Sequence, residues 1–173
     1  MTATTPVPSS QLVEHGATLY AAELDETLSV LGIQAEALEI NLDRNASGRP
    51  VPEWSDNTAF DRVLSSQRAP SSELARYARR GADFAQELLD QLGQDLRHAL
   101  CVGNQVRKEL LAFEDNIKEG MKYMVGILAG MLTSHLPAAV AAAAVAIATT
   151  VAVIVLKNNL HKFCLTSSLE LKE

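Results

Sequence analysis

Residues 137–156 read PAAVAAAAVAIATTVAVIVL and contain no charged side chain. They comprise nine Ala, five Val, two Ile, two Thr, one Leu and the opening Pro137. Twenty residues that rise about 1.5 Å each form a helix of roughly 30 Å, the thickness of the hydrocarbon core of a bilayer. Proline is tolerated at the first helical position, because the N–H that it lacks has no partner there. The stretch therefore predicts an apolar helix that is either inserted into a membrane or buried inside a helical bundle.

The segment just before it, residues 123–136, is also free of Lys, Arg, Asp and Glu. Its fourteen residues span only about 21 Å, which is too short to cross a bilayer alone. Two glycines four residues apart let helices approach closely in lipid. We therefore expect residues 123–156 to form either a hydrophobic hairpin or a transmembrane segment with a single crossing by 137–156. The candidate membrane-inserting residues are Gly126, Gly130, Pro137, Val145, Ile147, Val151, Ile154 and Leu156.

Charge is distributed unevenly along the 173 residues, whose formal net charge is −6. Residues 1–43 hold seven acidic side chains and no basic one, whereas Lys118, Lys122 and Lys157 flank the apolar segments. A hairpin would keep these lysines on one side, as the positive-inside tendency favours. We expect a membrane protein whose acidic helical region is cytoplasmic, with no cleaved signal peptide. A net negative chain is also a poor general binder of nucleic acid.

Residues 10–43 carry a helical pattern with a seven-residue repeat, following residues 1–9, which we expect to be a disordered leader. Leucine or alanine recurs at steps of four and three from Leu24 to Leu42. Gly16 and Gly32 weaken such a helix by roughly 1 kcal/mol each relative to alanine. Only 5% of the residues are aromatic, which favours an all-α chain with coiled-coil helices.

The long stretch after residue 70 keeps the period of a straight α-helix. Apolar or small residues recur fifteen times over 54 residues from Leu74 to Leu128, about 3.6 residues per step. The sequence Val102-Gly103-Asn104 is a plausible helix stop, but the apolar phase continues unchanged through it. The pattern favours one continuous or kinked helix over about 72–136, with two separate helices as the alternative. The amphipathic part is 71–122.

Residues 44–70 interrupt the helical pattern with one Gly and three Pro, and predict a linker with one short helix near 56–66. Residues 157–173 predict a polar tail. Leucine and phenylalanine positions on the helical stripes are candidates for helix association with a second copy or a helical partner. They are Leu24, Leu28, Leu31, Leu38, Leu88, Leu92, Leu110 and Phe113.

The sequence indicates no catalytic chemistry. Its four His and two Cys have no spacing typical of a metal site, and no phosphate-binding glycine loop or nucleophile motif occurs. We expect no catalytic residue, no cofactor and no metal. Cys164 follows the apolar run closely enough for S-palmitoylation, a possible lipidation.

The function expected from the sequence is therefore that of a non-enzymatic, membrane-associated helical protein. It self-associates or binds a partner through heptad helices and inserts residues 123–156 into lipid, as an anchored scaffold or adaptor. The first alternative is a membrane-perturbing effector, pore-former or secretion translocator. The second is a soluble four-helix bundle that acts as a binding module, with helices near 10–43, 72–101, 105–134 and 138–156.

Overall fold

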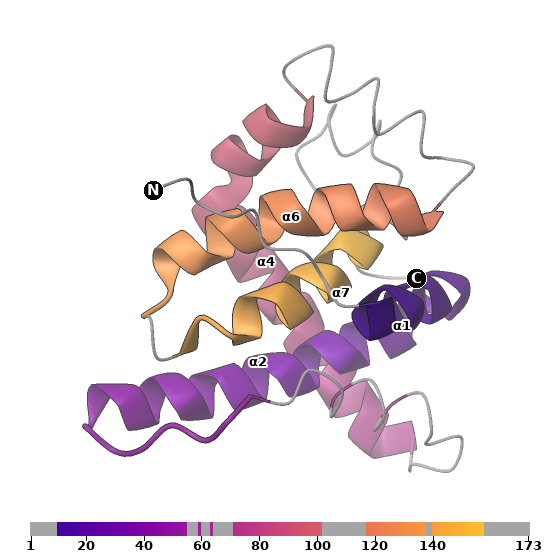
Figure 1. Ribbon diagram of the computed structural model, residues 1–173. Helices are drawn as coiled ribbons and strands as arrows, with labels where there is room; N and C mark the ends of the chain where they lie inside the picture. Colours follow the sequence, from indigo (N-terminus) through magenta and orange to yellow (C-terminus); the bar gives the residue numbers. More distant parts are fainter. Residues whose placement is uncertain are drawn as a thin grey trace.

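The computed structural model describes residues 10–54, 59, 63, 71–101, 117–137 and 140–157, and this part of the chain contains helices and no strand. The long helices are α1 (Ser10–Ala21), α2 (Leu24–Ala46), α4 (Ser71–Cys101), α6 (Ile117–His135) and α7 (Ala143–Lys157) (Figure 1). The predicted all-α class is confirmed. Leu110, Phe113, Cys164, the leader at 1–9 and the tail beyond Lys157 lie outside the described residues.

The predicted heptad region is divided into two helices, α1 and α2. The break falls at Ala22 and Glu23, where the Ala22 N–H donates to the Leu19 carbonyl and closes a tight turn. Helix α2 starts again with Asp25 and Glu26 in its first turn, where the positive end of the helix dipole favours acidic side chains. It ends at Ala46, and two residues further on Gly48 has a φ of 71°, the left-handed conformation that glycine adopts without strain.

Helices α2 and α4 pack against each other at a backbone-to-backbone contact between Gly32 and Gly81. A Cβ added to Gly32 would overlap the carbonyl oxygen of Tyr77 and lie 2.8 Å from its carbon. A Cβ added to Gly81 would meet the Leu28 carbonyl in the same way, again 2.8 Å from the carbon. Both glycines are therefore required by packing. The expectation that Gly32 only weakens its helix overlooked this contact.

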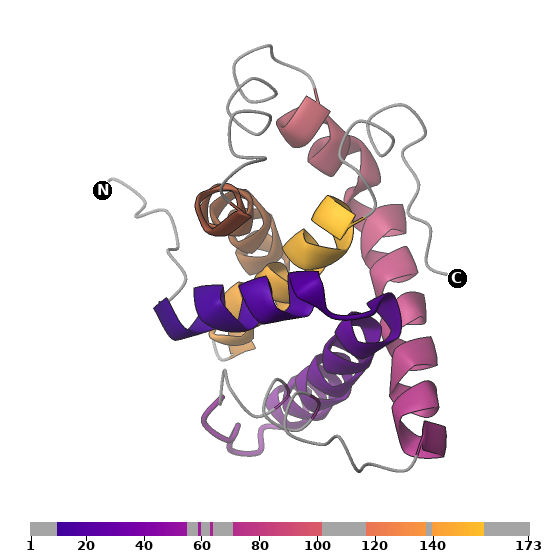
Figure 2. The same ribbon diagram turned by 90° about the vertical axis from the view of Figure 1, so that its right-hand side faces the viewer.

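Helix α7 lies in the middle of the bundle and contacts α1, α2 and α6 (Figure 2). Of its fifteen residues, twelve are buried, and Ala144, Ala152 and Ile154 have no exposed surface. Because it is apolar on every side, it can be surrounded completely without losing a solvated polar face. The apolar side chains of the other helices converge on it, so α7 organises the core.

The stretch from 72 to 136 does not form one straight helix. Helices α4 and α6 contact each other and run in different directions (Figures 1 and 2), which two parts of one straight helix cannot do. Residues 102–116, which include the predicted stop, lie outside the described residues. Helix α6 takes a different direction from α4 because its own stripe of buried side chains packs against α7.

The helix of the apolar run begins at Ala143, whereas the sequence predicted Pro137 as its first residue. The Val140 N–H donates to the Pro137 carbonyl at 3.0 Å, and the Ala144 N–H donates to the Ala141 carbonyl at 3.0 Å. These short turns precede α7, whose first residue is Ala143. Pro137 is exposed and lies outside the helix instead of occupying its first position. The described residues 136, 137 and 140–142 therefore lie between the end of α6 and the start of α7.

Candidate functional site

Helices α6 and α7 pack against each other, and we refer to them as the apolar pair. Helix α7 has no charged residue before its last residue, Lys157. Helix α6 contributes a stripe of buried side chains at alternating steps of three and one, which is one face of a helix. The stripe consists of Met121, Met124, Val125, Leu128, Ala129 and Leu132. The contact between the two helices is therefore apolar over its length.

The hydroxyl groups of the apolar pair bond to their own helices. In α7, the Thr149 hydroxyl donates to the Val145 carbonyl at 2.8 Å, and Thr150 donates to Ala146 at 3.3 Å. In α6, the Thr133 hydroxyl donates to the Ala129 carbonyl at 2.6 Å, and the Ser134 hydroxyl donates to the Met131 carbonyl at 2.7 Å. These groups need no partner from another helix or from water.

Helix α1 lies across one end of the apolar pair, and we refer to it as the cover helix. Gly16 is buried there against Met121 and Thr149, and a Cβ would lie 3.2 Å from the Thr149 methyl group. The exposed Lys118 ammonium pairs with Glu14 at 2.5 Å. At the other end of the cover helix, the Lys157 ammonium donates to the Ala22 carbonyl. Lys118 and Lys157 therefore both reach α1 or the turn that follows it.

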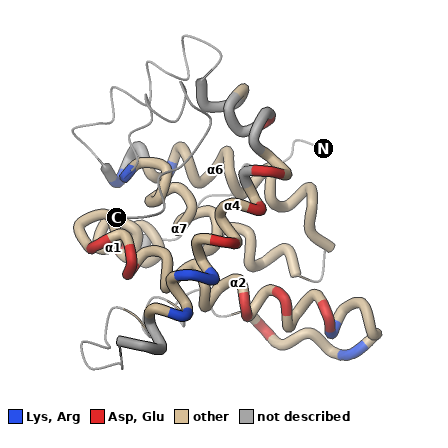
Figure 3. Tube along the Cα trace, turned by 180° about the vertical axis from the view of Figure 1, so that it is seen from behind, with Lys and Arg blue, Asp and Glu red and all other residues tan. Residues whose placement is uncertain are grey.

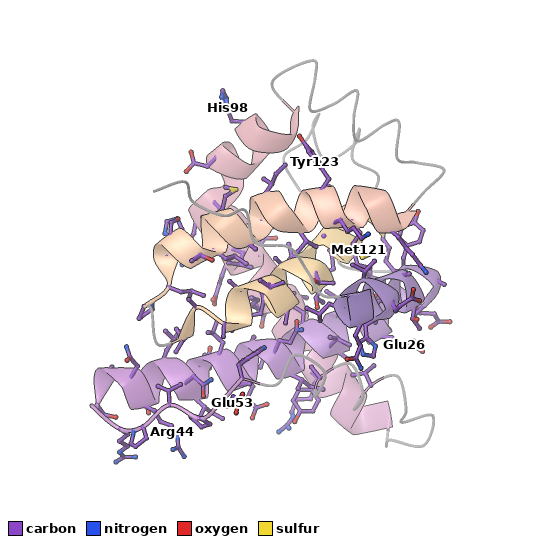
Figure 4. All side chains as sticks on the ribbon, viewed as in Figure 1. Glu26, Arg44, Glu53, His98, Met121 and Tyr123 are labelled. Atoms are coloured by element: carbon purple, nitrogen blue, oxygen red, sulfur yellow. The ribbon has the colours of Figure 1, made fainter. Side chains whose placement is uncertain are left out.

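Met121, at the end of α6 near the cover helix (Figure 4), is the side chain that fills the space left by Gly16. Its thioether is flexible and polarizable, so it adapts to a tight gap between helices. Sequence reasoning missed this contact, because the two residues are separated by more than a hundred positions. The only available signal was a glycine inside an otherwise regular helical pattern.

The predicted membrane-inserting residues are in several environments. Ile147, Val151 and Ile154 are buried, Gly126 is buried in α6, and Val145 and Leu156 are half-buried. Gly130 is exposed, and a Cβ added to it would meet nothing within 4 Å. Among the residues that the structure describes, no helix therefore packs closely against Gly130. The insertion of these residues into lipid stays a prediction.

The predicted association residues that are described pack inside the chain. Leu28, Leu31, Leu38 and Leu92 are buried, whereas Leu24 and Leu88 are half-buried. The buried part of α2 is wider than a heptad seam, since every residue from 27 to 35 is buried. This width arises because α4 packs on one side of α2 and α7 on another. Association of these residues with a second chain stays a prediction.

A groove of about 260 Å³ lies where α2, α4, α6 and α7 meet, and we refer to it as the four-helix groove. Its polar rim is formed by Glu39, Glu87, Gln91 and His135. Its apolar lining includes three predicted association residues. This lining consists of Leu38, Leu42, Phe84, Leu88, Leu92, Leu132, Leu136 and Ile147.

Charged side chains are concentrated outside the apolar pair. Seen from behind, Asp and Glu mark the surfaces of α1, α2 and α4, whereas most of α6 and α7 carries none (Figure 3). The Arg80 guanidinium on α4 pairs with Glu39 on α2, across the outer edge of their contact. The acidic surface and the apolar pair are therefore spatially separate.

Within the part of the chain that the structure describes, no three His, Cys, Asp or Glu side chains are grouped as metal ligands. No described helix combines the length and apolar character needed to span a bilayer. No family model, no curated protein and no solved structure matches this chain.

Proposed function

We propose that the chain is a non-enzymatic, membrane-associated helical protein whose bundle buries α7 and one face of α6 until residues 123–156 insert into lipid. The observation that carries the proposal is that α7 is apolar on every side and that its hydroxyls are satisfied within the helix. In lipid, each polar group must find its partner inside the inserted segment. The Thr149 and Thr150 hydroxyls of α7 meet that requirement.

Two polar contacts tie the middle and the end of α7 to other parts of the bundle. The Gln34 amide on α2 donates to the Ala146 carbonyl at 3.3 Å, and Lys157 donates to Ala22. Ala146 already accepts from Thr150 within α7, and Lys157 is the last residue of the helix. Loss of the Gln34 bond would therefore leave the Ala146 carbonyl with a partner inside α7. Apolar burial, which lipid also provides, is what holds α7 in place.

Insertion requires the helix to lengthen. The fifteen residues of α7 rise about 22 Å, whereas a bilayer core is roughly 30 Å thick. Extension of the helix back to Pro137 would supply the missing turn and a half, with proline at the position where helices tolerate it. Helix α6 would follow as the second arm of a hairpin, with Lys118, Lys122 and Lys157 at one membrane surface.

The proposal is tested by flotation of the full chain with vesicles of phosphatidylcholine and phosphatidylglycerol at pH 7.4 and pH 5. Val145→Arg is the informative variant, because Val145 is only half-buried and an arginine there can reach water while the bundle stays folded. At the bilayer centre the same arginine is unfavourable by about 2.5–3.5 kcal/mol. We expect at least a tenfold loss of floated protein with little change in Tm.

Ile40→Arg is the matched control, since Ile40 lies on α2 and is 51% exposed. It adds the same charge away from the apolar pair and should float like the wild type. Failure of the wild-type chain to float at either pH contradicts the proposal, as does undiminished flotation of Val145→Arg. Release of a trapped dye by the floated wild type would favour the pore-former alternative over the anchored scaffold, and its absence would favour the scaffold.

The four-helix groove favours a second candidate function, that of a helix-binding module. An apolar floor with Glu39 and Glu87 on its rim complements an amphipathic helix that carries lysines beside leucines. A synthetic fourteen-residue Leu/Lys helix labelled with a dye should bind with micromolar affinity. The half-buried Leu88 lines the groove, so Leu88→Glu should weaken binding at least tenfold, whereas Gln86→Glu on the exposed surface of α4 should not.

A further inference from the structure

We propose that Lys118 and Lys157 form a binding surface for anionic phospholipid headgroups, and that the cover helix α1 competes with the membrane for these two ammonium groups. The inference rests on the proposed membrane function, and it names the lipid class and the contact that regulates insertion. Helix α1 has twelve residues, crosses α7 and contacts both helices of the apolar pair (Figure 2). One short helix therefore touches both segments that are to enter the lipid.

Helix α1 is amphipathic, with its apolar face toward the bundle. Leu12, Val13, Gly16 and Leu19 are buried, and their spacing places them on one face of the helix. Glu14, on the opposite side, is exposed. A helix of this kind can leave the bundle and lie on a membrane surface, where its apolar face is again removed from water. Release of α1 into lipid therefore restores the burial that it loses.

Polar contacts tie the cover helix to a lysine on each helix of the apolar pair. Glu14 accepts from the Lys118 ammonium near the start of α6 at 2.5 Å. Lys157, the last residue of α7, donates to the carbonyl of Ala22, the residue directly after α1. Positions 14 and 22 are separated by roughly 12 Å along a helix, at 1.5 Å per residue. In the proposed hairpin the same two lysines lie at one membrane surface.

The chemistry of these contacts defines the partner. A carboxylate, a carbonyl and a phosphate oxygen all accept hydrogen bonds from an ammonium group, so a headgroup can take the place of either acceptor. The Lys118 side chain is 49% exposed and that of Glu14 is 65% exposed, so a phosphate can approach the pair from water. A bilayer with net negative charge attracts lysines near its surface, whereas a zwitterionic one lacks that net charge. Anionic phospholipid is therefore the class that competes best.

The connection of α1 to α2 allows the cover helix to move as a unit. The two helices are joined by Ala22 and Glu23 only, and α1 packs less extensively against α2 than against the apolar pair. Helix α2 is held separately by α4, through the backbone contact of Gly32 and Gly81. A change of backbone angles at the two joining residues therefore suffices to release α1 while α2 stays in place.

A reversible disulfide between α1 and α7 tests the proposal in the full chain. A Cβ added to Gly16 lies 3.2 Å from the Thr149 methyl group, so Gly16→Cys and Thr149→Cys are close enough to bridge once the flexible Met121 side chain shifts. Cys101→Ser and Cys164→Ser remove the native thiols. On vesicles of phosphatidylcholine and phosphatidylglycerol, we expect the oxidised chain to float at least tenfold less than the same chain in dithiothreitol.

The matched control is the chain with only Cys101→Ser and Cys164→Ser, which should float equally with and without dithiothreitol. Equal flotation of the oxidised and reduced bridged chains would overturn the cover role and leave membrane insertion intact. Absence of flotation of the control chain would refute the membrane proposal, and the cover role with it. The two failures are therefore distinguishable.

Glu14→Gln tests the competition without a bridge. It removes the carboxylate that holds Lys118, and because the ion pair is exposed, we expect partition onto these vesicles to rise by about two- to fivefold. Asp83→Asn removes the same charge from an exposed position on α4 and gives the baseline. A rise no greater than that of Asp83→Asn contradicts the proposal. Equal flotation of the wild type on phosphatidylcholine alone contradicts the assignment of anionic lipid.

Discussion

The α2–α4 pair and the apolar pair are two helix contacts made by different means. Helices α2 and α4 meet backbone to backbone at Gly32 and Gly81, and the ion pair between Arg80 and Glu39 lies at their solvent-exposed edge. Helices α6 and α7 meet through alanine, valine and methionine side chains, and the hydroxyls on them bond locally. The contact between α2 and α4 requires a fixed distance between the two backbones, and its ion pair is exposed to water. The contact between α6 and α7 requires only an apolar environment.

This difference indicates which contact should respond to a small change in shape and which to a change of solvent. A close backbone approach tolerates no added methyl group, because backbone atoms cannot move aside as side chains do. An apolar side-chain contact can be exchanged for lipid tails at little cost.

The largest effect is expected from Gly32→Ala and Gly81→Ala. Alanine favours a helix over glycine by about 1 kcal/mol, but each Cβ would overlap a carbonyl of the facing helix. We expect each variant to lower the free energy of unfolding by about 2–3 kcal/mol, measured by urea denaturation.

Gly130→Ala is the control for these variants, because nothing lies within 4 Å of its added Cβ. It should raise the free energy of unfolding by about 0.5–1 kcal/mol through helix propensity alone. Equal effects at Gly32 and Gly130 would mean that the backbone contact between α2 and α4 is not formed.

A smaller effect is expected from the ion pair of α2 and α4. The Arg80 side chain is 38% exposed and that of Glu39 is 63% exposed, so water screens their attraction. Arg80→Gln should cost about 1 kcal/mol or less, and the difference from wild type should shrink in 1 M NaCl. Arg79→Gln, on an exposed neighbour, gives the baseline. A loss that is independent of salt would assign the role of Arg80 to packing.

The smallest effect is expected in α7 itself. Thr149→Val and Thr150→Val remove hydroxyls that bond only to their own helix, so each should change the free energy of unfolding by about 0.5 kcal/mol or less. Thr27→Val removes a hydroxyl that reaches the Leu19 carbonyl in α1 at 3.4 Å, and should cost about 1 kcal/mol. Thermal melts of the three variants test this order. A larger loss in α7 would show that its hydroxyls matter to the bundle.

Local sequence patterns predicted the helices where a proline or the spacing of apolar residues was sufficient. A helix after Pro70 was expected from rules that involve only neighbouring residues, and α4 covers Ser71–Cys101. The burial of Leu28, Leu31, Ala35 and Leu38 follows from their spacing. These features depend on the helix period, which is visible in the sequence alone.

Other features depend on residues far apart in the chain and had no local signal. Gly32 is explained only by Gly81, and Gly16 only by Met121. The break at Ala22 is not marked by glycine or proline, and it follows from the way α1 crosses the apolar pair. A cavity of about 210 Å³ lined by Gln34 and Trp54 likewise combines α2 with a segment that the sequence predicts as a linker. Tertiary contacts determined each of these features.

The contact between Ala22 and Lys157 also has a consequence for the way the protein is made. These residues are separated by 135 positions, and a ribosome adds about 5–20 residues per second. On the order of ten seconds therefore pass between the synthesis of the cover helix and that of the helix beneath it. Throughout that interval α1 and α2 lack α7, the helix against which both of them pack. The centre of this fold is made last among its described helices, so the nascent chain completes its core only as α7 leaves the ribosome.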